Sequence, residues 1–117
     1  MTEYHGSCQC GAVTFHADLD LENGAITCNC SRCRRLGSRL VFTPRAMFTL
    51  DSGADSLTEY KFNRNVIAHQ FCKVCGIEPF GYGQMPDGSA MTAVNINVLD
   101  GIDPAAIKTT MYDGASS

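Results

Sequence analysis

The sequence predicts a mainly β domain, in which short strands fold around metal sites and helices are limited to short turns. Two observations predict the strands: short apolar or alternating segments recur along the chain, and turn-forming Asp, Asn and Gly residues separate them at close intervals. A third predicts the metal sites, because the seven cysteines gather in three groups, as metal ligands do. The length of 117 residues predicts that residues 1–117 form a single domain.

Two of the predicted strands show alternation of apolar side chains. The first covers residues 13–17, and the last covers residues 92–98, where Val94, Ile96 and Val98 would share one face. Between them, further strands are predicted at residues 40–43, 48–50, 57–62 and 67–71.

Two helical turns are predicted, and neither is longer than a few residues. One covers residues 31–36, and the other begins at Asp103, a good N-cap residue, with Pro104 in the first helical position. We expect the small, polar residues 114–117 to fray.

Charge and hydropathy limit the classes of partner. A net charge of −3 argues against a nucleic-acid partner, which demands a basic footprint. No apolar segment approaches the roughly 20 residues of a membrane span, and residues 1–6 lack the features of a signal peptide. We therefore expect a cytoplasmic protein that does not act at a membrane. The sequence does not predict an oligomeric state.

The number of cysteines also limits their chemistry. Seven is odd, so a complete set of internal disulfides is excluded, and a reducing compartment favours metal ligands or redox groups. The spacing fits neither common ferredoxin pattern, and Cys72 and Cys75 lack the βαβ context of a thioredoxin-like redox pair.

Two cysteine pairs have the spacing of metal ligands. Cys72 and Cys75 are separated by two residues and followed by glycine, which allows a turn with both sulfurs facing one ion. Cys8 and Cys10 are closer, and the glycine after Cys10 allows the backbone to curl around an ion. Joined, the two pairs would make a closed tetrahedral zinc site, although spacing alone leaves the pairing open.

The third group, Cys28, Cys30 and Cys33, offers three thiolates within six residues. A zinc ion held by three protein ligands keeps a position for water or substrate, as catalytic zinc does. The alternatives are a second structural zinc, completed by a histidine or an acidic side chain, and a set of metal-free redox thiols. Neighbouring arginines would offset the negative charge, or they would form an ordinary solvated face.

Other polar and aromatic residues have more ordinary interpretations. We expect His69 to be packed or hydrogen-bonded rather than a zinc ligand or a proton shuttle. Asn95 and Asn97 are expected to bond the backbone, and the aromatic and glycine residues of segment 80–83 to pack in the core with tight turns.

Three motifs of this sequence resemble those of the glutathione-dependent formaldehyde-activating enzyme family. Residues 6–13, 28–35 and 71–76 carry the resemblance, with Val94-Asn95 and Leu99-Asp100-Gly101 matching the family's C-terminal signature. The resemblance extends from about residue 6 to about residue 104 and includes all seven cysteines in order.

The resemblance implies an Mss4-like β fold with two zinc ions per chain. Its implied ligands are four cysteines for a structural zinc (Cys8, Cys10, Cys72, Cys75) and three for a functional zinc (Cys28, Cys30, Cys33). The implied reaction joins glutathione and formaldehyde to S-hydroxymethylglutathione, so the expected partner is a small thiol or its aldehyde adduct. Arg34 and Arg35 are the weaker candidates, as binders of substrate carboxylates.

Two other functions stay open for such a domain. One is a non-enzymatic zinc module that binds a protein or chromatin partner, since the centromere protein V of animals carries a similar domain. The other is methionine sulfoxide reduction, which needs a reactive cysteine outside the zinc ligands, whereas every cysteine here lies in a cluster. We therefore expect a zinc-dependent carbon–sulfur lyase.

Overall fold

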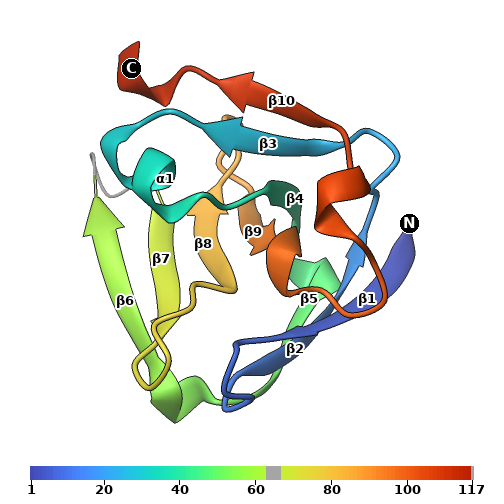
Figure 1. Cartoon of the computed structure of the whole chain (residues 1–117), viewed down its shortest axis with the longest axis vertical. Coiled ribbons are helices and arrows are strands. Elements are labelled where there is room, and N and C mark those ends of the chain that lie inside the picture. Colours follow the sequence, from blue (N-terminus) through green and yellow to red (C-terminus); the bar gives the residue numbers. More distant parts are fainter. Residues whose placement is uncertain (63–66, 117) are drawn as a thin grey trace.

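The fold is known from a computed structural model that describes residues 1–62 and 67–116 (Figure 1). The described residues contain one α-helix, α1 (Ser31–Leu36). The strands are β1 (Thr2–Ser7), β2 (Thr14–Leu19), β3 (Ala25–Cys28), β4 (Leu40–Pro44), β5 (Phe48–Ser52), β6 (Leu57–Phe62), β7 (Ile67–Cys72), β8 (Phe80–Gln84), β9 (Ala90–Asn95) and β10 (Thr109–Tyr112). Short 3-10 turns lie at Arg45–Met47, Ala54–Ser56, Ile96–Val98, Pro104–Ala106 and Gly114–Ser116.

The strands form two sheets in the described part of the chain. The smaller has the order β1-β2-β5, and the larger has the order β10-β3-β4-β9-β8-β7-β6. Strand β10 runs parallel to β3, whereas β3 and β4, β4 and β9, and the strands from β9 to β6 pair antiparallel. In Figure 1, β1, β2 and β5 gather at one corner of the molecule, while β10 closes the opposite edge above β3. The predicted mainly β fold is confirmed.

An aromatic cluster joins the two sheets. Phe15 of β2, Phe48 of β5 and Phe80 of β8 are all buried, with ring centroids 4.6 to 5.8 Å apart. Burial of one such ring contributes about 1.5–3 kcal/mol. This core fixes the β1–β2 hairpin against the larger sheet, and so brings the loop after β1 close to the end of β7.

The structure confirms most of the elements predicted from alternation and capping. Strands β2, β4, β5, β6 and β7 overlap the predicted segments, and α1 has its predicted bounds. Asp103 caps the turn Pro104–Ala106, since its carboxylate accepts a hydrogen bond from the Ala105 amide at 3.1 Å.

One predicted strand is too long. Strand β9 ends at Asn95, and Ile96–Val98 forms a 3-10 turn instead of the second half of a strand. The reason is local: the Asn95 side chain accepts a hydrogen bond from the Asn97 amide at 3.1 Å and so caps the turn. Ile96 remains buried, so the apolar pattern marked the core correctly but not the backbone conformation.

Four strands and the end of the chain departed from expectation. Strands β1, β3, β8 and β10 were not predicted. Strands β1 and β10 are largely exposed and so lack an apolar alternation, and the two glycines of β8 were interpreted as tight turns. The expectation that residues 114–117 fray is wrong for the described residues 114–116, where Gly114 is buried; Ser117 lies outside them. No helix in the described residues has the length and apolar character needed to cross a membrane.

Candidate metal centres

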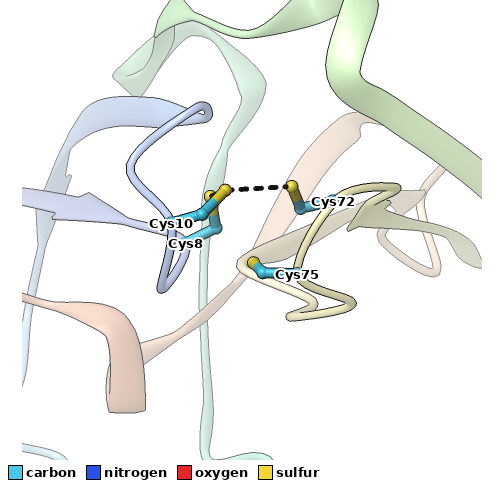
Figure 2. Close-up of side chains that lie close together, drawn as sticks. All are labelled: Cys8, Cys10, Cys72 and Cys75. Carbon is cyan, nitrogen blue, oxygen red and sulfur yellow. Dashed lines mark hydrogen bonds between the residues drawn. The ribbon is translucent and has the colours of Figure 1, made fainter.

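Four cysteines converge where the loop after β1 meets the end of β7, and we call them the four-cysteine cluster (Cys8, Cys10, Cys72 and Cys75). Figure 2 shows the sulfurs of the two loops facing one another. All four Sγ atoms lie within 4.8 Å of one another, with 3.6 Å between Cys8 and Cys10 and 3.7 Å between Cys10 and Cys72. A tetrahedral ion with Zn–S bonds of about 2.3 Å requires sulfurs about 3.8 Å apart, so this donor set fits zinc.

Two glycines allow the turns that carry these sulfurs. Gly11 and Gly76 have φ of 82° and 81°, in the left-handed region that favours glycine. The Gly76 amide donates to the Cys72 carbonyl at 2.7 Å, and the Gly11 amide donates to the Cys8 carbonyl at 3.2 Å. Both turns have the form expected from the glycine that follows each cysteine pair.

Backbone amides favour the thiolate form of this cluster. The amides of Ile77 and then of Cys10 bond the Cys75 sulfur and lower the pKa of its thiol to about 6. The Val13 amide donates to the Cys8 sulfur at 3.3 Å. For Cys10 the Ala12 amide acts in the same direction, but burial and the neighbouring thiols outweigh it and raise the pKa of that thiol to about 11. Because the pKa of the Cys10 thiol is raised, this cluster keeps one proton unless a bound cation displaces it.

The second group, which we call the three-cysteine cluster (Cys28, Cys30 and Cys33), is built on one short segment. Cys28 ends β3, Cys30 is the N-cap of α1, and Cys33 lies within α1; their Sγ atoms lie within 4.8 Å of one another. The Cys33 amide donates to the Cys30 sulfur at 3.3 Å. Burial opposes ionisation of Cys30, but this amide bond prevails, together with hydrogen bonds from the Cys33 and Cys28 side chains and the Arg32 amide, and the pKa of the thiol is lowered.

No histidine or carboxylate of the described residues completes the three-cysteine cluster at comparable distances. The alternative of a second closed structural zinc site therefore finds no support in that part of the chain. Burial raises the pKa of the Cys33 thiol above its ordinary value, so an ion that binds here displaces a proton. The three sulfurs form an incomplete coordination shell.

The end of the chain covers one side of the three-cysteine cluster. Tyr112 of β10 pairs with Cys28, and a Cβ atom on Gly114 would lie 2.6 Å from the Cys28 sulfur. The side chain of Asn29 binds this segment. Its amide nitrogen donates to the Asp113 carboxylate at 2.9 Å, and its amide oxygen accepts from the Ala115 backbone amide at 2.9 Å. Sequence analysis missed this cover, although the Asp-Gly pair at 113–114 is a turn signal.

The predicted substrate residues lie on different faces of α1. Arg35 lines an open pocket of about 500 Å³ with Ser31, Arg32, Leu36 and Tyr60, and donates to the Ser31 carbonyl at 2.8 Å. Arg34 is exposed and does not line this pocket. At 100° per residue, Cys33 lies about 160° around the helix from Arg35. The role of both arginines in substrate binding stays a prediction.

A buried polar group was missed beside the helix. Glu78 accepts a hydrogen bond from Arg32 with one carboxylate oxygen, while the other lies 2.9 Å from Nδ1 of His69. The prediction that His69 is packed or hydrogen-bonded is confirmed, since its side chain is buried and bonds Glu78. The signal for Glu78 was an acidic residue within the otherwise apolar segment 77–80.

Comparison with known proteins agrees with this geometry. The family model of the glutathione-dependent formaldehyde-activating enzyme matches residues 3–113. A crystal structure of a Rhodobacter sphaeroides protein is similar with a TM-score of 0.78 and 31% sequence identity, covering 91% of this chain and 99% of that one. The resemblance carried by the cysteine motifs is thereby confirmed.

Proposed function

Because the chain belongs to the glutathione-dependent formaldehyde-activating enzyme family, we propose that it is a zinc-dependent carbon–sulfur lyase. Its substrate is the adduct of a small thiol with an aldehyde, of the S-hydroxymethylglutathione type. The observation that carries the proposal is the convergence of three sulfurs without a fourth protein ligand in the described residues. Such a site leaves room for a substrate sulfur or oxygen.

The two clusters take different roles in this proposal. Cys8, Cys10, Cys72 and Cys75 would hold a structural zinc, and Cys28, Cys30 and Cys33 would hold the functional zinc, giving two ions per chain. When bound, the functional zinc supplies Lewis acidity, which favours the thiolate form of a substrate thiol. We place the protein in the cytoplasm, where thiols stay reduced.

The protein's own groups arrange the reaction. In the direction of synthesis, the substrate sulfur forms a bond to the aldehyde carbon, and the carbonyl oxygen takes up the proton released by the thiol. The amide of Cys33 bonds the Cys30 sulfur and orients it, and the segment around Gly114 keeps water from the Cys28 side. Arg34 and Arg35 are proposed to bind substrate carboxylates from the rim of the helix.

The test compares wild type with Cys30→Ser, using formaldehyde with glutathione and with a panel of other small thiols. We expect the variant to lose one of two zinc ions and at least roughly 100-fold in turnover, because a Lewis acid contributes several kcal/mol. Retention of the other zinc and of the circular dichroism spectrum shows that the fold is intact. Unchanged turnover would contradict the metal-centred mechanism. Wild type that turns over no thiol adduct would favour a non-enzymatic zinc module.

A further inference from the structure

Glu78 is a buried carboxylate between the two cysteine clusters. Its side chain is 5% exposed, yet both oxygens are paired, one with the Arg32 guanidinium and one with His69, whose side chain is 8% exposed. A buried charge is costly unless it is paired, and removal of one partner leaves the other uncompensated. A carboxylate in this position therefore holds its two partners in place.

The backbone ties Glu78 to the four-cysteine cluster. Only two residues separate it from Cys75, and the Ile77 amide bonds the Cys75 sulfur while the Ile77 carbonyl accepts from the Cys72 amide at 2.8 Å. The Glu78 carbonyl in turn accepts from the Asn95 side chain at 3.0 Å. The turn that sets the positions of two metal-binding sulfurs thus also sets the position of Glu78.

Arg32 ties Glu78 to the three-cysteine cluster. It stands between Cys30 and Cys33 in α1, a helix of six residues with no buried residue. A helix this short is not stable by itself and must be held by tertiary contacts. Arg32 supplies two such contacts, because its guanidinium pairs with Glu78 and lies over the ring of Tyr60, 4.7 Å from the ring centroid.

We propose that Glu78 is a positioning residue for the three-cysteine cluster. It holds Arg32, and through Arg32 it holds α1, in register with the turn of the four-cysteine cluster. The order of one cluster thereby supports the geometry of the other. The inference rests on the metal-binding part of the proposed function and not on its lyase chemistry.

The experiment measures zinc affinity at the three-cysteine cluster by competition with a chromophoric chelator, in wild type and in Glu78→Gln. We expect binding there to weaken roughly 10- to 100-fold, as is usual when a group that orients metal ligands is lost. The matched control is Glu59→Gln, the same change at a half-exposed glutamate of β6. This control should bind zinc as wild type does.

A double-variant cycle separates positioning from a general loss of stability. Arg32→Met alone should weaken zinc binding as Glu78→Gln does, and the two changes together should cost little more than either one. A variant with Cys28, Cys30 and Cys33 all changed to serine binds zinc at the four-cysteine cluster alone. In this background, Glu78→Gln should leave the zinc affinity of the four-cysteine cluster unchanged.

Three results would overturn the proposal. Unchanged or tighter zinc binding in Glu78→Gln would show that freeing the Arg32 charge beside the thiolates matters more than fixing α1. Additive effects of the two substitutions would show that Glu78 does not act through Arg32. Binding of fewer than two zinc ions by wild type would overturn the proposed function as well, whereas absence of lyase turnover with two ions bound would leave this inference standing.

Discussion

The two cysteine clusters differ in how far apart along the chain their cysteines lie and in how deeply these are buried. The four-cysteine cluster joins segments far apart in the chain, since Cys10 and Cys72 are separated by 62 positions, and Cys8 and Cys72 are buried. The three-cysteine cluster lies within six residues, from the end of β3 into a helix that buries none of its own residues, and Cys30 is the buried member of the cluster. A metal in the first site closes a long loop, whereas a metal in the second closes a short one.

From this difference we expect the four-cysteine cluster to stabilise the domain and the three-cysteine cluster to be the reactive one. A closed set of four ligands offers no position for a substrate but links the β1–β2 hairpin to the larger sheet. We expect the incomplete set of three to contribute little to the fold, since contacts of Arg32, Asn29 and the segment after β10 hold this region. Such a site can gain or lose a ligand without unfolding the domain.

The largest expected effect comes from breaking the four-cysteine cluster. Cys72 is completely buried, and Cys72→Ser should abolish zinc binding at that cluster and remove most of the stability of the domain. A structural zinc contributes about 10 kcal/mol or more, which compares with a total stability of about 5–15 kcal/mol. Thermal unfolding followed by circular dichroism, with elemental analysis, measures both effects.

Cys33→Ser is the matched control for this prediction. It removes a ligand of the three-cysteine cluster and should also cost one zinc ion, but with a decrease in Tm of only a few degrees. Equal destabilisation by the two variants would contradict the division between a structural and a functional cluster.

A smaller effect is expected at the cover of the three-cysteine cluster. A Cβ atom on Gly114 would lie 2.6 Å from the Cys28 sulfur, so Gly114→Ala must displace either that sulfur or the covering segment. We expect roughly tenfold weaker zinc binding at this cluster, with no change at the other. Competition with a chelator measures it.

Ala115→Ser serves as the control for Gly114→Ala, because it adds one atom to the neighbouring, exposed side chain. It should bind zinc as wild type does. Wild-type affinity in Gly114→Ala would show that this segment does not lie against the sulfur in solution.

Much of the fold and of the two cysteine clusters could be predicted from the sequence. The three cysteine groups were recognised from their short spacing, whereas the family resemblance, and not the spacing, implied which groups share an ion. Strand β2 was predicted because its alternation reflects burial on one face, and β4 because its residues form a short apolar segment. The sequence also identified His69 as a hydrogen-bonded side chain.

The parts that were missed depend on contacts between distant segments. Strand β10 is exposed throughout, and only its pairing with β3 makes it a strand. The local signal at Glu78, an acidic residue in an apolar segment, does not identify its partners, because Arg32 and His69 come from α1 and β7. The cover at Gly114 depends on Asn29, 86 positions from the Ala115 amide that it binds.

The smallest expected effect concerns the titratable part of that cover. Hydrogen bonds from Asn29 and then from Ser116 lower the pKa of Asp113 from its ordinary value of 3.8. Because the pKa is lowered in the folded state, the stabilisation by this carboxylate is complete above 3.8 and is lost as the pH falls through the folded value. Asp113→Ala should speed zinc release from the three-cysteine cluster by roughly two- to fivefold, as expected for an exposed polar pair.

The ratio of the release rates of Asp113→Ala and wild type should stay constant between about pH 8 and about pH 5, because Asp113 remains ionised throughout that range. Stopped-flow release to a chelator measures it. The control is Asp87→Ala, since the pKa of Asp87 is likewise lowered by hydrogen bonds, from Ser89, but in the turn between β8 and β9, outside the segments that carry the cysteines. A ratio that changed within this range would show that a different group fastens the cover, and with it that the three-cysteine cluster owes its shape to contacts other than those of Asn29.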